Sequence, residues 1–273
     1  MDISAVTSID DPRLADYGLA RSPEELKARG LFLAESREVA AALIRCGRWR
    51  VRSLLATASA LERLRGELAM LGDGVPVFKA EPSLMTGVVG YNVHRGCLAV
   101  GERGPGLALG GLLAGLGTGA GLLVALETVS NPDNIGGIFR NSLAFGAGGV
   151  LLGPGSGDPL YRKAIRTSMG AGLRVPFAEV PDLAGALVGL RREGWLVAAL
   201  ACREPAQDLD RFRFEARPRK LVLVAGSEGA GLSPEILAAA DVSLRIPMAP
   251  DVDSLNVAVA TGIALHALTR PEP

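Results

Sequence analysis

The stretch KLVLVAGSEGAGLSP, at residues 220–234, decides the fold class. Its first part, KLVLVAG, is continuously apolar after Lys220, without the polar alternation of a strand that has one wet face. A glycine-rich turn follows, and Ser233 and Pro234 have the residue types that begin helices. The stretch therefore predicts a strand, a turn and a helix, with the strand buried on both faces in a parallel sheet.

Four more apolar runs surround this stretch in the C-terminal part of the chain. They are LLVALE at 122–127, GGVLLG at 148–153, WLVAAL at 195–200 and VSLRIP at 242–247. The first three are each followed by a turn and a helical pattern, as in α/β folds with helices on both faces of a parallel sheet. We expect one such domain over residues 120–273, with its functional site at the carboxyl ends of the strands.

Residues 1–104 predict a smaller α/β domain. Its strand-like runs are LFLA at 31–34, RSLLAT at 52–57, PVFKA at 76–80 and GCLAVG at 96–101. A helical pattern lies between the first two runs, with Ser36 as its cap and Gly47 as its stop. Residues 105–119 are dominated by Gly, Leu and Ala, which indicates a linker between the two domains.

Composition excludes several functional classes. Of the 273 residues 48% are hydrophobic, enough for a buried core, and 29 basic residues balance 29 acidic ones. There is thus no global field for nucleic acid, and RNA binding would need local basic clusters. Three cysteines without a C-x-x-C pair indicate a reduced, cytoplasmic protein, and two isolated histidines predict no metal site.

One uncharged segment, residues 104–126, is long enough to cross a bilayer. Eight of its residues are glycine, and neither end carries an aromatic belt, so we expect a linker and a buried strand instead of a membrane span.

Three polar segments interrupt the apolar pattern just after predicted strands. They are NPDNIGGIFRNS at 131–142, GSEGAGLS at 226–233 and IPMAPDVDSLNVAVATG at 246–262. We expect Asn134 and Ser254 to cap the helices that follow, with Asn256 in the first helical turn. Gly136 and Gly137 disfavour a helix, so they predict a close backbone approach at that point.

Taken together and in this order, the three segments resemble the motifs of the SpoU (TrmH-like) family of RNA 2′-O-ribose methyltransferases, within the SPOUT superfamily. The resemblance covers about residues 122–268. Residues 1–104 look like the ribosomal-protein-like substrate-recognition domain of many family members. The resemblance implies that the C-terminal domain forms a deep trefoil knot, which binds S-adenosylmethionine, and that the protein is a homodimer.

Carried over to this sequence, the resemblance implies two sets of site residues. Main-chain contacts to the methyl donor are expected at Gly226, Ile246 and Leu255, and the donor site also includes Leu200, Glu228 and Met248. The residues expected to act on the RNA are Asn134, Arg140, Ser254 and Asn256. Arginine stays protonated in proteins, so we expect Arg140 to clamp a phosphate and stabilise the developing alkoxide, while the other three orient the ribose hydroxyl.

The RNA partner is expected to be ribosomal RNA in preference to tRNA, because of the N-terminal domain. Two basic clusters are candidates for phosphate contacts: Arg45, Arg48, Arg50 and Arg52, and Arg162, Lys163, Arg166 and Arg174. The main alternative is a non-catalytic RNA-binding protein that keeps the methyltransferase fold. A nucleotide-dependent oxidoreductase is disfavoured because no G-x-G-x-x-G fingerprint follows a predicted strand.

Overall fold

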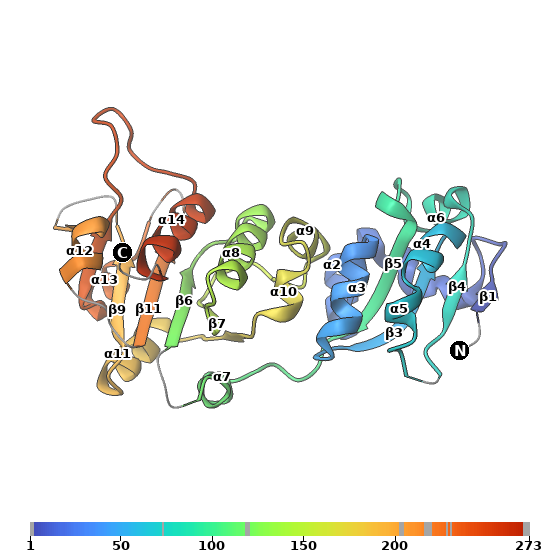
Figure 1. The fold of residues 1–273 in the computed structure, drawn as a ribbon, viewed down its shortest axis with the longest axis horizontal. Coiled ribbons are helices and arrows are strands. Elements are labelled where there is room, and N and C mark those ends of the chain that lie inside the picture. The colour runs from blue at the N-terminus through green and yellow to red at the C-terminus, as the bar shows by residue number, and fades with distance from the viewer. Residues whose placement is uncertain are drawn as a thin grey trace. The chain divides into compact units, whose positions relative to one another are not determined.

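The computed structural model describes residues 3–72, 74–117, 121–201, 205–215, 220–227, 229 and 231–269. The chain divides into two compact units (Figure 1). The first consists of Met1–Pro105 together with Pro159–Arg174, and the second of Gly106–Asp158 with Val175–Pro273.

The first unit is built on a five-stranded mixed sheet with the order β1-β4-β3-β5-β2. Its strands are β1 (Ile3–Ala5), β2 (Leu31–Glu35), β3 (Arg50–Ala56), β4 (Val77–Lys79) and β5 (Cys97–Glu102). The strands β1, β4 and β3 are parallel, whereas β5 runs antiparallel to both β3 and β2. The four strands predicted here are confirmed, and β1 is an additional, three-residue edge strand.

Short helices surround this sheet. They are α1 (Ala15–Gly18), α2 (Pro23–Ala28), α3 (Arg37–Cys46), α4 (Ala58–Arg63), α5 (Arg65–Leu68) and α6 (Pro82–Val89), with 3-10 turns at Pro12–Leu14, Leu19–Arg21 and His94–Gly96. The predicted ends of α3 are confirmed: the Ser36 hydroxyl accepts a hydrogen bond from the Val39 N–H, and Gly47 takes the left-handed conformation.

The first unit also contains a segment from the middle of the chain, with helices α9 (Arg162–Thr167) and α10 (Ala171–Arg174). The Trp49 indole donates a hydrogen bond of 2.9 Å to the Leu173 carbonyl oxygen. The Arg162 guanidinium lies 2.5 Å from the carboxylate of Glu35, which is 1% exposed. The first compact unit thus includes a segment that lies beyond residues 1–104, the range expected for the first domain.

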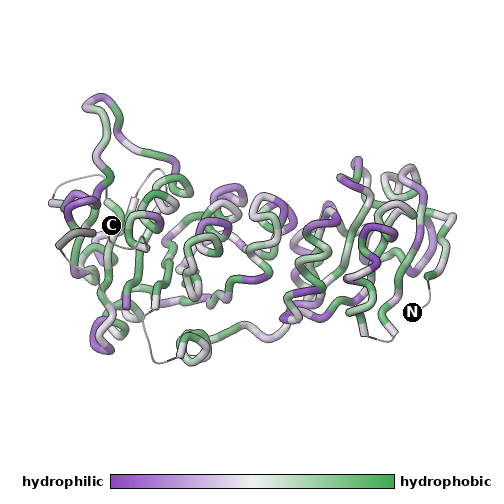
Figure 2. The backbone as a smooth tube through the Cα atoms, in the orientation of Figure 1, coloured by the Kyte–Doolittle hydropathy of each residue, from purple (hydrophilic) through white to green (hydrophobic). Residues whose placement is uncertain are grey.

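The second unit has a seven-stranded, fully parallel sheet with the order β10-β12-β9-β11-β6-β7-β8. Its strands are β6 (Gly121–Glu127), β7 (Gly149–Leu152), β8 (Phe177–Glu179), β9 (Leu196–Leu200), β10 (Gln207–Asp208), β11 (Lys220–Gly226) and β12 (Val242–Arg245). All five strands predicted here are present, and Figure 2 shows the central ones mainly in the colour of apolar residues. The short edge strands β8 and β10 were not predicted.

Helices cover both faces of this sheet. They are α7 (Leu109–Gly115), α8 (Pro132–Ala144), α11 (Leu183–Arg192), α12 (Leu209–Glu215), α13 (Pro234–Ala239) and α14 (Val257–Thr269). Helices α7, α11 and α13 share one apolar core with the strands, and α8 and α14 pack together on the opposite face (Figure 1). Helix α7 lies inside the stretch expected to be a linker, and its Leu112 is buried in the core.

Candidate active site

A cavity of about 410 Å³ opens at the carboxyl ends of β9, β11 and β12. This is the edge of a parallel sheet where ligand sites are expected. Five of the six predicted donor-site residues line it: Leu200, Gly226, Ile246, Met248 and Leu255. The sixth, Glu228, lies outside the described residues. The rest of the wall is mainly small or apolar, with Ser227, Gly229, Gly231, Leu232, Leu237 and Leu244 among its members.

The loop that follows β11 is folded tightly against the end of the strand. The Gly231 N–H donates a hydrogen bond of 3.1 Å to the Ser227 carbonyl oxygen, and Gly231 has a φ of 72°. A side chain at Gly226 would overlap the carbonyl group of Gly231. Glycine is therefore required at both positions, and the wall of the cavity is formed here by backbone atoms.

Two predicted site residues from distant parts of the sequence meet beside this cavity. The Asn256 Nδ2 donates a hydrogen bond of 2.8 Å to Oδ1 of Asn134, across 122 positions in the sequence. Asn134 is in the first turns of α8 and only 7% exposed. Asn256 lies between Leu255 and Val257, which both line the cavity. This hydrogen bond thus joins the first turns of α8 to the segment that forms part of the cavity wall.

The helix caps at this site differ from the expected ones. Asn131, and not Asn134, caps α8, because its side chain accepts a hydrogen bond from the Asp133 N–H and Pro132 then begins the helix. At α14 the side chain of Asn256 accepts hydrogen bonds from the N–H groups of Ala258 and Val259, and Ser254 makes no such bond to any described residue. Ser254 instead lines the cavity.

Helices α8 and α14 approach each other closely at two glycines. A Cβ atom at Gly137 would lie 2.8 Å from that of Ala258, and one at Gly262 would lie 2.7 Å from the Asn141 side-chain nitrogen. The Asn141 amide donates a hydrogen bond of 2.7 Å to the Ala258 carbonyl oxygen. The close approach predicted for Gly137 is confirmed, and it sets the separation of the helices that carry Asn134 and Asn256.

Arg140 takes a different position from the other predicted residues. It is exposed on α8 and is not part of the cavity wall. Within the described part of the chain it has no hydrogen-bond or ion-pair partner. Its guanidinium group is therefore free to meet a ligand that approaches this face of α8 from solvent.

One residue that holds the loop beside the cavity was not singled out from the sequence. Glu127, at the end of β6, accepts a hydrogen bond from the backbone of Ser233, where the loop after β11 ends. The signal that could have found it is a carboxylate directly after an apolar strand, at the edge of the sheet where sites occur.

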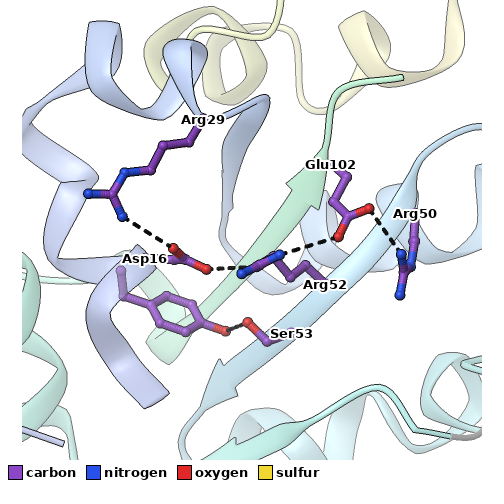
Figure 3. A network of polar contacts seen from close by, with 7 residues as sticks. Asp16, Arg29, Arg50, Arg52, Ser53 and Glu102 are labelled. Carbon is purple, nitrogen blue, oxygen red and sulfur yellow. Dashed lines mark hydrogen bonds and ion pairs between the residues drawn. The ribbon is translucent and has the colours of Figure 1, made fainter. Parts of the chain in front are cut away.

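The first predicted basic cluster is largely neutralised by acidic neighbours. Arg52 lies 2.8 Å from Asp16 and 3.6 Å from Glu102, and Arg50 lies 3.4 Å from Glu102 (Figure 3). Arg45 pairs with Glu67 in the same way, and Arg48 stacks on the Trp49 ring. This surface offers much less free positive charge than the sequence indicated.

The second basic cluster keeps more of its charge. Arg162 is engaged with Glu35, and its guanidinium also lies over the Tyr91 ring. Arg166 and Arg174 are exposed, and neither has an ion-pair partner among the described residues. They belong to the first unit and are its more accessible candidates for phosphate contacts.

The residues that the structure describes contain no cluster of three or more His, Cys, Asp or Glu side chains that could hold a metal ion. In the same residues, no helix is both long and apolar enough to span a bilayer.

Comparison with known proteins agrees with this architecture. The model of the SpoU rRNA Methylase family matches residues 121–266. An uncharacterized tRNA/rRNA methyltransferase of Mycobacterium bovis is 34% identical over 99% of this chain and 93% of its own length. The AdoMet-bound rRNA methyltransferase of Sinorhizobium meliloti has a TM-score of 0.81 at 26% identity, covering 97% of each chain. A TrmH-family protein of Porphyromonas gingivalis has a TM-score of 0.79 at 26% identity, covering 96% of this chain and 98% of that one.

Proposed function

Because this chain belongs to the SpoU rRNA Methylase family, we propose that it transfers a methyl group from S-adenosylmethionine to a ribose 2′-hydroxyl of RNA, in the cytoplasm. The names of its relatives include both tRNA and rRNA, and the S. meliloti structure is of an rRNA methyltransferase with AdoMet bound. Ribosomal RNA is the proposed substrate in preference to tRNA.

One observation carries the proposal. The cavity at the end of the parallel sheet is lined by Leu200, Gly226, Ile246, Met248 and Leu255, the residues expected to hold the methyl donor. Asn256, which hydrogen-bonds Asn134, lies in the sequence between Leu255 and Val257 of this wall. The residues expected to bind the methyl donor are far apart in sequence, and in the structure they line one cavity.

The cavity fits the proposed donor in size and character. Its volume of about 410 Å³ is within the usual range for small-molecule sites. Backbone atoms of Gly226 and Ile246 would hydrogen-bond the adenine, and Leu200, Met248 and Leu255 would enclose its apolar faces. When bound, S-adenosylmethionine supplies an activated methyl group on a sulfonium, so the protein has mainly to orient the acceptor oxygen and stabilise its charge.

Arg140 is proposed to hold the RNA phosphate next to the target ribose and to stabilise the negative charge that develops on its oxygen. Its exposure, and the absence of a hydrogen-bond or ion-pair partner among the residues that the structure describes, support this role. Arg140→Lys keeps the charge but loses the bidentate fork, so kcat should fall at least tenfold while donor binding is kept. Turnover close to that of the wild type would remove the clamp from the mechanism.

The deep trefoil knot remains part of the proposal for the second unit. The strand order supports it, since β11 lies between β9 and β6, and the chain after β12 returns to pack α14 against α8. The backbone trace of an experimental structure tests it: a chain that straightens when pulled from both ends has no knot.

We also propose that the protein is a homodimer through α14. This helix exposes Val259 and Ile263, which are 51% and 39% exposed and lie one turn apart, with the exposed His266 on the same stripe. A second copy would cover these apolar side chains. Val259→Asp should shift the mass measured by light scattering to that of a monomer, whereas Met70→Asp, at a residue of the first unit that is 59% exposed, should not. Equal masses for both variants would contradict this interface.

The reaction is tested by incubating the protein with S-adenosylmethionine labelled in its methyl group and with ribosomal RNA or tRNA in separate reactions. A 2′-O-methyl group blocks alkaline cleavage at its linkage, so the label should appear in an alkali-resistant dinucleotide. Label in mononucleotides would contradict ribose methylation. RNA binding without label in either RNA would favour the alternative, a non-catalytic RNA-binding protein.

A further inference from the structure

The amide of Asn256 has only one possible orientation. One end of the amide faces the backbone N–H groups of Ala258 and Val259, at 3.0 and 3.2 Å. A backbone N–H can only donate, so the amide atom that faces it must be the acceptor oxygen, Oδ1. The N-terminus of α14 therefore determines which way this side chain points.

The orientation of the Asn256 amide determines that of the Asn134 amide. Since Oδ1 of Asn256 is turned to its own helix, its Nδ2 faces Asn134, at 2.8 Å. An amide nitrogen can only donate, so Asn134 must present its oxygen here. The remaining group of Asn134 is its NH2, for which no partner occurs within the described part of the chain.

The surroundings oppose a reversal of Asn134. With the amide turned over, its nitrogen would face the nitrogen of Asn256, and the hydrogen bond between the two side chains would be lost. Asn134 is only 7% exposed, so water would replace that bond poorly. The second tie, from Asn141 to the Ala258 carbonyl, keeps the two helices at the distance that this bond needs.

We propose that Asn134 acts as a hydrogen-bond donor to the RNA and that the atom it contacts is the ribose oxygen that accepts the methyl group. This rests on the function proposed above. A donor holds that oxygen and stabilises negative charge on it, but Asn134 does not take the hydroxyl proton, because its oxygen faces Asn256 and a neutral amide is not a base. The hydrogen bonds at the N-terminus of α14 thus orient Asn256, and Asn256 in turn leaves the NH2 group of Asn134 on α8 as the donor to the substrate.

Two substitutions of Asn134 separate a donor from an acceptor. Asn134→Asp keeps an oxygen for Asn256 but replaces the NH2 with an anionic acceptor, whereas Asn134→Ala removes both groups. A donor role predicts that kcat falls at least tenfold in both variants and that the Asp variant is no faster than the Ala variant, while the Kd for S-adenosylmethionine changes less than threefold in both. An Asp variant that is clearly faster than the Ala variant would overturn the proposal.

Asn256→Asp tests whether the orientation of the Asn256 side chain determines that of Asn134. One carboxylate oxygen can still cap α14, but the other now faces Asn134, which must turn its NH2 inward and present oxygen to the RNA. We expect kcat to fall at least tenfold, with the circular dichroism of the folded protein unchanged. A rate within twofold of the wild type would show that the direction of the amide does not matter.

A readout without RNA distinguishes this inference from the proposed function. In the wild type the side-chain NH2 of Asn256 should exchange slowly with solvent in nuclear magnetic resonance spectra, and that of Asn134 quickly. In Asn256→Asp the Asn134 NH2 should become the slow one. This pattern would stand even if no RNA were methylated, and the opposite pattern in the wild type would refute the inference on its own.

Discussion

The carboxylate Oε2 of Glu127 accepts a hydrogen bond of 2.8 Å from the backbone N–H of Ser233. Glu127 ends β6, opposite Gly226 of β11 in the register of the two strands. Ser233 ends the loop after β11, and its hydroxyl caps α13 through the Ile236 N–H. The bond ties the far end of the loop that lines the cavity to the neighbouring strand.

Glu127→Ala should weaken binding of S-adenosylmethionine without unfolding the protein. A hydrogen bond to a charged group contributes roughly 1.5–3 kcal/mol, so we expect the Kd to rise by about tenfold or more. Glu127→Gln keeps an acceptor oxygen and should stay within about threefold of the wild type. Isothermal titration calorimetry measures both Kd values. An Ala variant that binds as tightly as the Gln variant would show that the hydrogen bond between Glu127 and Ser233 does not contribute to binding of S-adenosylmethionine.

Gly262→Ala should destabilise the protein, because the added methyl group would lie 2.7 Å from the Asn141 side-chain nitrogen. Overpacking of this kind costs roughly 1–3 kcal/mol. The matched control is Gly189→Ala in α11, where nothing lies within 4 Å of the added carbon and helix propensity should stabilise by up to ~1 kcal/mol. Urea unfolding should show a lower free energy of unfolding than the wild type for Gly262→Ala and a higher one for Gly189→Ala. A free energy of unfolding that also rises in Gly262→Ala would mean that α8 and α14 tolerate a wider separation.

Most strands could be predicted from the sequence, including the edge strand β2, but the short edge strands β1, β8 and β10 could not. Runs such as KLVLVAG at β11 are apolar because both faces are buried, and that pattern is visible locally. The strand β8 has three residues and β10 has two, too short for any period to be visible. Helix α7 was missed because its glycines are typical of a linker.

Contacts between distant segments were visible only through the family resemblance. Local pattern assigns α9 and α10 to helices, but it does not say which core they join, and they pack in the first unit. The pairing of Asn134 with Asn256 spans 122 positions and has no periodic signal. The cap at Asn131 was missed because Asn134 has the same preference, and only the position of Pro132 distinguishes the two.

Replacing Arg166 and Arg174 together with Ala should weaken the binding of ribosomal RNA and reduce its dependence on salt. Both side chains are exposed in the first unit without an ion-pair partner among the described residues. The loss of two phosphate contacts should lower the slope of log K against log salt by about 1.5. Arg65→Ala is the control, because Arg65 is equally basic and exposed but pairs with Glu62 at 2.7 Å. A slope that is unchanged in the double variant would show that Arg166 and Arg174 do not contact the RNA phosphates.

Cys97 should make the protein less stable at alkaline pH. Its side chain is 0% exposed in β5, and burial raises the pKa of the thiol to about 12. The thiol of the unfolded chain ionises near pH 8.5, so the unfolded state loses this proton first and is favoured as the pH rises. Between pH 8 and pH 10 the free energy of unfolding should fall by about 1–2 kcal/mol more in the wild type than in Cys97→Ala. Urea unfolding at both pH values measures this difference. Parallel curves for the two proteins would mean that the thiol already ionises in the folded state.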